Sequence, residues 1–151
     1  MRDHDHYLAI QNLIYKYALC LDQGDLEGVA ELFKHGEILA PDLGTSQKGY
    51  DEVLKTYQEA TRIYSDTGTP KTKHITSNVM IEFDDDYKSA RSESYFTVIQ
   101  GTESFPLQPI ISGRYHDEFA LESNSWLFMK RKIYIDLMGD CSAHLLYDIN
   151  A

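Results

Sequence analysis

Two short segments of this sequence carry side chains that could move a proton together. Tyr17 and Asp22 lie five residues apart in the first segment, and His74 lies in the second. A neutral imidazole can take a proton from a carbon that a carbonyl or an aromatic system makes acidic. A carboxylate bonded to its other ring nitrogen would fix the tautomer, and a phenol could donate to an oxygen that gains charge or leaves. The three residues are therefore candidates for general acid–base catalysis, provided that the fold brings them together.

Each candidate also has an ordinary structural interpretation. Asp22 could bond the turn at residues 23–24, and His74 could be exposed where a strand begins. Tyr17 could be a core residue, although a buried tyrosine still needs a partner for its hydroxyl. The elements that position these residues decide between the two interpretations.

The first half of the chain has the pattern of helices. Apolar residues recur at helical spacing from Ile10 to Leu21, which predicts a helix that runs into Asp22 and is broken by Gln23-Gly24. The other elements expected in this half are a short helix at 26–33 capped by Asp25, a brief strand at 37–40, and a third helix from position 49 or 51 to about 64.

After a polar loop at 65–73 the period changes to two. This pattern predicts four strands joined as a meander, at 75–83, 88–100, 110–121 and 126–138. No repeat or linker divides the chain, so residues 1–151 are expected to form a single domain. The predicted fold class is α+β, with three N-terminal helices packed on one face of a strongly curved, mainly antiparallel sheet.

Composition excludes several classes of function. The net charge of −10 argues against nucleic acid and anionic membrane surfaces as partners, because both require a basic surface. No stretch approaches 18 apolar residues, and the polar, acidic N-terminus is unlike a signal peptide. Two cysteines, Cys20 and Cys141, form no disulfide framework and suit a reducing cytoplasm, which is the expected location.

Three segments of the chain resemble the NTF2-like, SnoaL-like superfamily. They are the pattern from Tyr17 through Asp22 and Asp25 to Phe33, the run His74–Asn78, and the last hairpin with 113–119, 126–128 and Arg131. The resemblance covers nearly the whole chain. It implies a cone, in which helices and a bent sheet enclose a pocket that is open at one end.

The resemblance also implies roles for particular residues. The site pattern is most similar to scytalone dehydratase, bile-acid 7α-dehydratase and the hexachlorocyclohexane dehydrochlorinase, where an Asp at the end of the first helix lies beside a His on the strand after the third helix. Asp22 and His74 occupy these positions, and Tyr17 matches a tyrosine of the bile-acid enzyme, whereas the dehydrochlorinase has a lysine there. All three enzymes carry out eliminations. The implied catalytic set is Asp22, His74 and Tyr17.

Residues that would contact a substrate are expected among the aromatic side chains and one cation. They are Tyr57, Tyr95, Tyr115, Phe128 and Arg131. Strict alternation places Arg131 on one strand face with Leu127, Met129 and Ile133, which is an unusual position for a charge. Its partner could be an acidic side chain or the substrate, or it could close the rim of the cone. Two further histidines, His116 and His144, receive no role, although the tail that carries His144 could fold over the pocket mouth.

No cofactor and no metal are expected. The sequence lacks the CxxC, HExxH and EF-hand spacings as well as a glycine-rich nucleotide loop. His4 and His6 alternate with acidic residues at a chain end that is expected to be solvated.

These features favour a cofactor-independent lyase, such as a dehydratase, or an isomerase that acts on a small hydrophobic oxygenated metabolite through an Asp22–His74 acid–base pair. A SnoaL-type polyketide cyclase is an alternative that uses the same enolate chemistry. Another is a non-catalytic ligand-binding protein or a relative of the dioxygenase β-subunit, because this fold hosts many functions. We also expect a homodimer or higher homo-oligomer, formed through the open face of the sheet.

Overall fold

Three helices occupy the first half of the computed structural model, which describes residues 2–149: α1 (Asp3–Gln23), α2 (Leu26–Leu32) and α3 (Gly49–Ala60). Helix α1 ends because Gly24 takes a left-handed conformation with φ of 75°, and its N–H donates to the Leu21 carbonyl at 3.0 Å. The Asp25 carboxylate then accepts from the Gly28 N–H at 2.8 Å and caps α2, as predicted. This turn places Asp22 in the last turn of α1.

Six strands form one sheet in the spatial order β2-β1-β6-β5-β4-β3. The strands are β1 (Glu37–Ala40), β2 (Thr45–Lys48), β3 (Thr72–Phe83), β4 (Ser89–Gln100), β5 (Gln108–Glu122) and β6 (Ser125–Met138). Strands β3 to β6 form the predicted antiparallel meander, whereas β1 pairs with β6 in parallel. A short 3-10 turn, η1 (Pro41–Leu43), joins β1 to β2.

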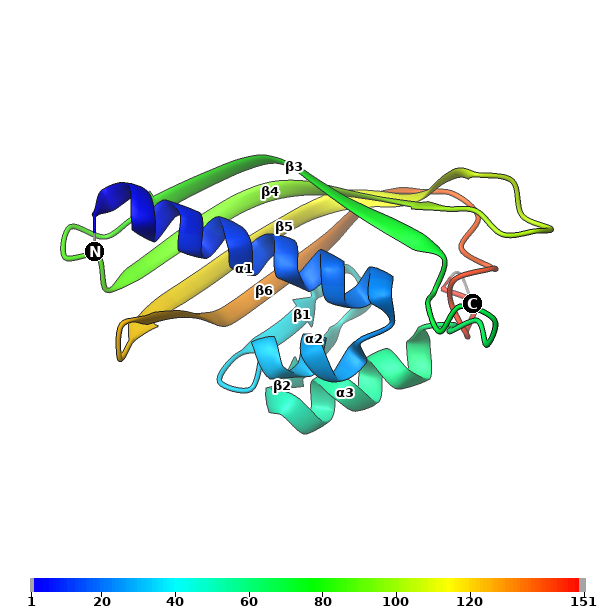
Figure 1. Cartoon of the computed structure of the whole chain (residues 1–151), viewed down its shortest axis with the longest axis horizontal. Coiled ribbons are helices and arrows are strands. Elements are labelled where there is room, and N and C mark those ends of the chain that lie inside the picture. The colour runs from blue at the N-terminus through cyan, green and yellow to red at the C-terminus, as the bar shows by residue number, and fades with distance from the viewer. Residues whose placement is uncertain (1, 150–151) are drawn as a thin grey trace.

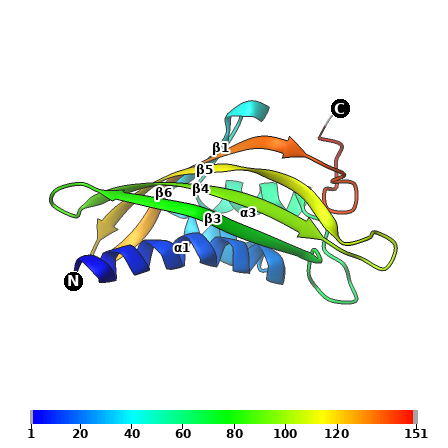
Figure 2. The same ribbon diagram turned by 90° about the horizontal axis from the view of Figure 1, so that it is seen from above.

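Figure 1 shows α1 running across the sheet, with α2 and α3 beside the short strands β1 and β2. In the perpendicular view the long strands bow over α1 along its length (Figure 2). The curvature coincides with irregularities in the strands. In β3 the pairing shifts between Ser77 and Met80, where Asn78 has a φ of 55°. In β5, Gly113 approaches β6 so closely that a Cβ would lie 1.9 Å from the Tyr134 carbonyl oxygen.

The core lies between α1, α2 and the inner face of the sheet. From the helices it takes Ile10, Ile14, Tyr17, Leu21, Val29 and Phe33, and from the sheet Phe96, Val98, Tyr115, Phe119, Trp126 and Phe128. Among residues 2–149 no helix is long and apolar enough to cross a membrane.

The α+β architecture and the order of its main elements are confirmed, but three details differ from the sequence prediction. Strand β2 was not expected, because its residues are polar and mostly exposed and so lack an alternating pattern. Helix α3 ends at Ala60 rather than near Tyr64, since Thr61 is extended and pairs with Leu145 of the C-terminal tail. Strand β3 begins three residues before Ile75, at Thr72, whose side chain bonds the end of α1.

Candidate active site

Asp22 and His74 meet where the end of α1 packs against the start of β3. The Nδ1 atom of His74 lies 2.6 Å from Oδ1 of Asp22, and the backbone N–H of His74 donates to Oδ2 at 2.8 Å. The Thr72 hydroxyl donates to Oδ1 at 2.9 Å. Both side chains are largely buried, with 7% of His74 and 9% of Asp22 exposed. The carboxylate is thus held by three donors that fix its orientation toward the imidazole.

The electrostatics of this pair keep Asp22 ionised. Burial alone would raise the pKa of Asp22, but the contacts with His74 and the Thr72 hydrogen bond together hold it below its ordinary value. An ionised carboxylate only accepts hydrogen bonds, so the geometry assigns the proton of the neutral imidazole to Nδ1. The second ring nitrogen, Nε2, then carries a lone pair.

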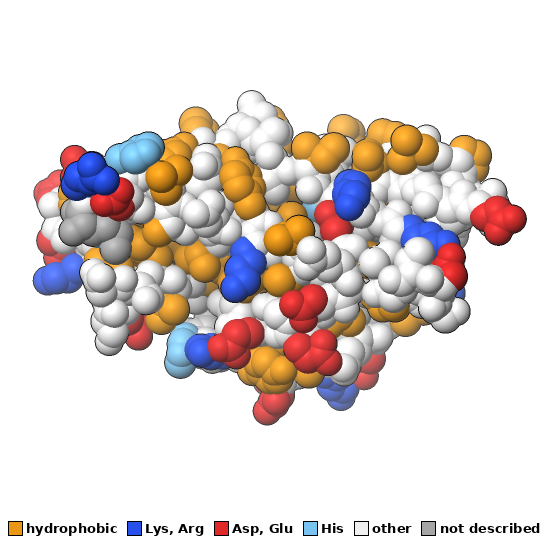
Figure 3. All heavy atoms as spheres, in the orientation of Figure 1, with side chains coloured by type: hydrophobic (Ala, Val, Ile, Leu, Met, Phe, Trp, Pro, Cys, Tyr) orange, Lys and Arg blue, Asp and Glu red, His pale blue; other side chains and the backbone are white. Residues whose placement is uncertain are grey.

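A groove of about 620 Å³ opens beside the pair, between α1 and the start of β3. Asp22 and His74 line it together with Tyr15, Leu19, Lys16 and Lys73. On the face of the molecule that α1 covers, charges of both signs are scattered among apolar groups (Figure 3). The groove therefore combines the Asp22–His74 pair with a mixed apolar and polar wall.

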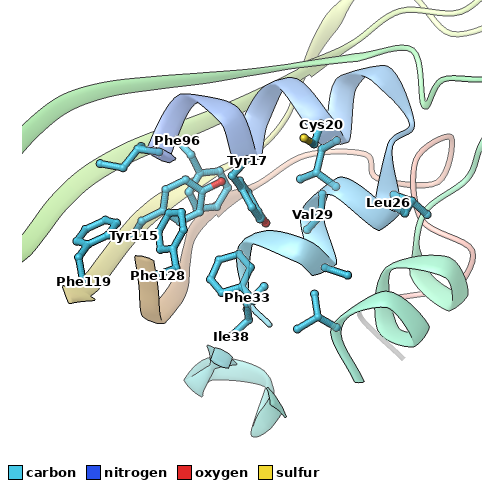
Figure 4. Close-up of a cluster of buried hydrophobic side chains, with 14 of the residues drawn as sticks. Tyr17, Cys20, Leu26, Val29, Phe33, Ile38, Phe96, Tyr115, Phe119 and Phe128 are labelled. Carbon is cyan, nitrogen blue, oxygen red and sulfur yellow. The ribbon is translucent and has the colours of Figure 1, made fainter. Parts of the chain in front are cut away.

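Tyr17 does not line this groove. Its ring points from α1 into the interior, edge-on to Phe33 and Tyr115 with centroids 6.1 and 5.8 Å away (Figure 4). The hydroxyls of Tyr17 and Tyr57 lie 2.5 Å apart, so the predicted substrate-binding Tyr57 is the partner that a buried Tyr17 requires. Burial raises the pKa of Tyr17, Tyr57 and Tyr115, which keeps all three phenols protonated.

Arg131 is fully buried and paired with Asp117. Its Nε and Nη2 atoms each donate to the carboxylate at 2.8 Å. The guanidinium also lies over the rings of Tyr115, Tyr17 and Phe128, at 3.8, 4.3 and 5.0 Å from their centroids. Of the partners that the sequence left open, the structure shows an acidic side chain. The third nitrogen, Nη1, is buried with no partner among the described residues.

The strand face expected for Arg131 needs a correction. Pairing between β5 and β6 shifts between Glu118 and Phe119. Glu118 pairs with Lys130 and Phe119 with Phe128, so Met129 has no partner on β5. This bulge turns Arg131 inward with Phe128 instead of leaving it on the face of Leu127 and Met129. Phe128 itself is 1% exposed and stacks on Phe33 with centroids 4.7 Å apart.

One other candidate, Tyr95, lies on the opposite face of the sheet. Tyr95 is 53% exposed and follows Ser94, which is buried, so alternation turns it away from the Asp22–His74 pair. It lines a separate groove with Arg114 and His116. The structure thus brings Tyr57, Tyr115, Phe128 and Arg131 around Tyr17 in the interior and leaves Tyr95 apart.

Two residues near the pair received no role from the sequence. Thr72 bonds Asp22, and its position two residues before His74 on a strand places both side chains on one face, which is a signal that could have been used. His144 comes from the C-terminal tail, and its ring centroid lies 6.4 Å from that of His74. No periodicity or motif in the sequence predicts where this tail packs. Among the described residues, no group of three or more His, Cys, Asp or Glu side chains could hold a metal ion.

Residues 2–132 match the family model of the SnoaL-like domain. The chain belongs to the SnoaL-like family. No curated protein matches it. A candidate scytalone dehydratase from Novosphingobium aromaticivorans DSM 12444 is 26% identical to this SnoaL-like protein, with a TM-score of 0.68 over 91% of both chains.

Two further solved structures resemble this SnoaL-like protein in fold. A protein of unknown function with a cystatin-like fold, from Nostoc punctiforme PCC 73102, is 24% identical, with a TM-score of 0.71 over 90% of this chain and 94% of its own. ActVI-ORFA from Streptomyces coelicolor is 16% identical, with a TM-score of 0.69 over 86% of this chain and 97% of its own. At this identity the similarity concerns the fold.

Proposed function

We propose that this SnoaL-like protein is a cofactor-independent lyase or isomerase that acts on a small, hydrophobic, oxygenated molecule. The observation that carries the proposal is the 2.6 Å contact between Asp22 and Nδ1 of His74, at a position where both side chains line a groove. The name of the Novosphingobium relative, a candidate scytalone dehydratase, supports elimination as the reaction class.

In the proposed reaction Nε2 of His74 takes a proton from the carbon next to a carbonyl. The C–H electron pair becomes the carbon–carbon double bond of an enolate, and the carbonyl oxygen gains the negative charge. Asp22 stabilises the imidazolium that forms, as the carboxylate does in hydrolytic triads. The enolate then expels a β-hydroxyl group, which leaves as water after accepting the proton from Nε2, so that His74 is neutral again.

An isomerase would share the first step and return the proton to a different carbon. A cyclase would also share this step, since ring closure proceeds from the same enolate. The Tyr17 hydroxyl bonds that of Tyr57 in the interior and does not line the groove, so Tyr17 is assigned an electrostatic role from behind the site rather than a contact with the oxygen. Because Tyr17 does not line the groove, its contribution is expected to be smaller than that of His74.

The test is a panel of β-hydroxy ketones incubated with the protein in D₂O and followed by mass spectrometry. Loss of water identifies a dehydratase, and deuterium uptake without loss of mass identifies an isomerase or simple proton exchange. For the best substrate, His74→Ala and Asp22→Ala should each lower kcat by about 100-fold or more, and the double variant should lose little beyond the worse single one.

The matched control is His35→Ala, because His35 is exposed and belongs to the turn after α2. It should react at the wild-type rate. Wild-type rates in His74→Ala, or neither water loss nor deuterium uptake across the panel, would refute the proposal and favour a ligand-binding protein.

The proposal includes self-association through the outer face of the sheet. Ile75, Met80, Tyr95 and Leu137 lie on this face with exposed fractions of 49%, 62%, 53% and 70%. Ile75 and Leu137 belong to one cross-strand row with Thr97 and Ser112 between them. A second copy would remove this apolar surface from water, and a symmetric dimer is the simplest such assembly.

A further inference from the structure

The last described residues of the chain, 139–149, form a strap that returns to the region between α3 and β3 (Figure 1). The backbone N–H of Leu146 donates to the Ala60 carbonyl at 2.9 Å, and that of Arg62 donates to the His144 carbonyl at 2.8 Å. Thr61 and Leu145 form an isolated antiparallel bridge. The C-terminal strap is thus joined to residues 60–62, at and just after the end of α3, by backbone hydrogen bonds at His144 and Leu146.

Two side chains fix the strap at the residue before His144. The Ala143 carbonyl accepts from the Tyr64 hydroxyl at 2.6 Å and from Nε2 of Gln100 at 3.0 Å. Gln100 is fully buried at the end of β4 and also bonds the Pro70 carbonyl, so it ties the strap to the loop that leads into β3. The direction in which the His144 ring points is therefore set by the fold.

The ring points toward the candidate active site. Its centroid lies 6.4 Å from that of His74, with the two planes at 68°. The Nδ1 atom of His144 is buried and has no hydrogen-bond partner among the described residues. A buried polar atom without a partner is unfavourable, which makes such an atom a natural contact for a water or ligand oxygen.

Burial is the main reason that His144 stays neutral. Burial, followed by repulsion from His74, lowers the pKa of His144 to about 4, and the attraction of Asp22 opposes this only weakly. A neutral imidazole offers one donor and one acceptor, and it can polarise a carbonyl without taking up a proton. His74 keeps the contact with the Asp22 carboxylate, which His144 lacks.

We propose that His144 is a substrate-binding residue, whose ring hydrogen-bonds the oxygen of a planar apolar ligand next to His74. The C-terminal strap then contributes His144 from beside the groove, whose lining comes from α1 and the start of β3. This assignment rests on the proposed function, because it names the group that receives the oxygen while His74 acts on the neighbouring carbon. The ligand class is an aromatic or enol-like compound with a hydroxyl or carbonyl group.

The experiment compares 2-naphthol with naphthalene, which has the same rings without the oxygen, by equilibrium dialysis against the full-length protein. Wild type should bind 2-naphthol about ten times more tightly than naphthalene or better. His144→Leu keeps an apolar side chain of similar bulk and should bring this ratio close to one. His144→Gln, which keeps a donor and an acceptor, should restore much of it. His35→Leu, the same change at an exposed site, should leave the ratio unchanged.

The proposal is overturned if wild type shows no preference for 2-naphthol, including no binding at millimolar concentration, or if His144→Leu keeps the wild-type ratio. If His144→Leu does not fold, the ¹⁵N resonances of the His144 ring in wild type decide instead. A shift on addition of 2-naphthol supports the contact, and unchanged resonances refute it.

Binding of 2-naphthol requires no proton transfer, so the binding experiment can succeed or fail independently of the turnover experiment that tests the proposed function. An intact preference that depends on His144, with no turnover of the ketone panel, would refute the lyase or isomerase and retain the binding site. Turnover with no effect of His144→Leu on the ratio would refute only the role of His144.

Discussion

The buried, neutral His144 should make the stability of the protein depend on pH in a way that one substitution removes. In the unfolded chain this histidine takes up a proton near its ordinary pKa of 6.5, whereas in the folded protein its pKa is about 4. Between these values the unfolded state binds more protons, so the folded state loses stability as the pH falls from about 6.5 to 4. Above pH 7 the effect is absent, because both states are neutral.

The size of the effect follows from the two pKa values. At pH 5 the unfolded state gains about 2 kcal/mol from protonation that the folded state cannot share, and the limit below pH 4 is about 3.4 kcal/mol. His144→Gln removes the titrating group. The difference in unfolding free energy between wild type and His144→Gln should therefore change by about 2 kcal/mol between pH 8 and pH 5, in favour of the variant at the lower pH.

Urea unfolding of both proteins at pH 5, 6, 7 and 8 measures this difference. The contributions of the other titrating groups to the unfolding free energy are shared by both proteins and cancel in the comparison. The charged or titratable groups that face His144 are His74 and Asp22, and both are retained in His144→Gln, so the comparison isolates His144. If the unfolding free energies of wild type and His144→Gln differ by the same amount at pH 5 and at pH 8, the inference that burial holds His144 neutral is refuted.

Three further outcomes test the interior and the outer surface. Tyr17→Phe should lower kcat by about 10-fold, since it removes one donor and keeps the packing of the ring, and loss of 100-fold or more would make Tyr17 as important as His74. Arg131→Met should destabilise the protein by about 3–5 kcal/mol in urea because it leaves Asp117 buried without a partner, whereas Arg131→Met combined with Asp117→Leu should recover much of the loss. If the double variant is no more stable than Arg131→Met alone, the unpaired Asp117 carboxylate is not the cause of the lost stability. Light scattering at micromolar concentration should give a dimer mass that Leu137→Glu shifts toward the monomer, and a wild-type monomer would contradict the outer-face contact.

The sequence pattern predicted the position of Asp22, because the end of a helix is determined by neighbouring residues. The helical spacing up to Leu21 and the Gln23-Gly24 break place Asp22 in the last turn of α1, and both features appear in the structure. The contact with His74 spans 52 residues. No periodicity determines such a distance, so the expectation of this pair came from the resemblance to the family.

What the sequence could not give is the register of the strands. Asp117 pairs with Arg131 only because the bulge at Met129 shifts the hairpin by one residue. A regular hairpin would have placed Arg131 and Phe128 on opposite faces. Tyr95 was taken as a candidate for the same reason, because a one-residue difference in register decides whether a side chain faces the interior or the outer surface. The tail that carries His144 has neither an apolar period nor a turn motif that would anchor it, and its position follows from contacts with residues 60–64 and 100.

The parallel pairing of β1 with β6 has a consequence for how the chain acquires its structure. Ile38 lies opposite Arg131, and the two residues are separated by about ninety positions. During synthesis β1 keeps one edge unpaired until β6 has left the ribosome. Contacts of such long range slow folding and leave strand edges open to other chains in the meantime. The last strand therefore acts as the closing element of the sheet, and truncated or stalled chains that lack it should be prone to aggregate through β1.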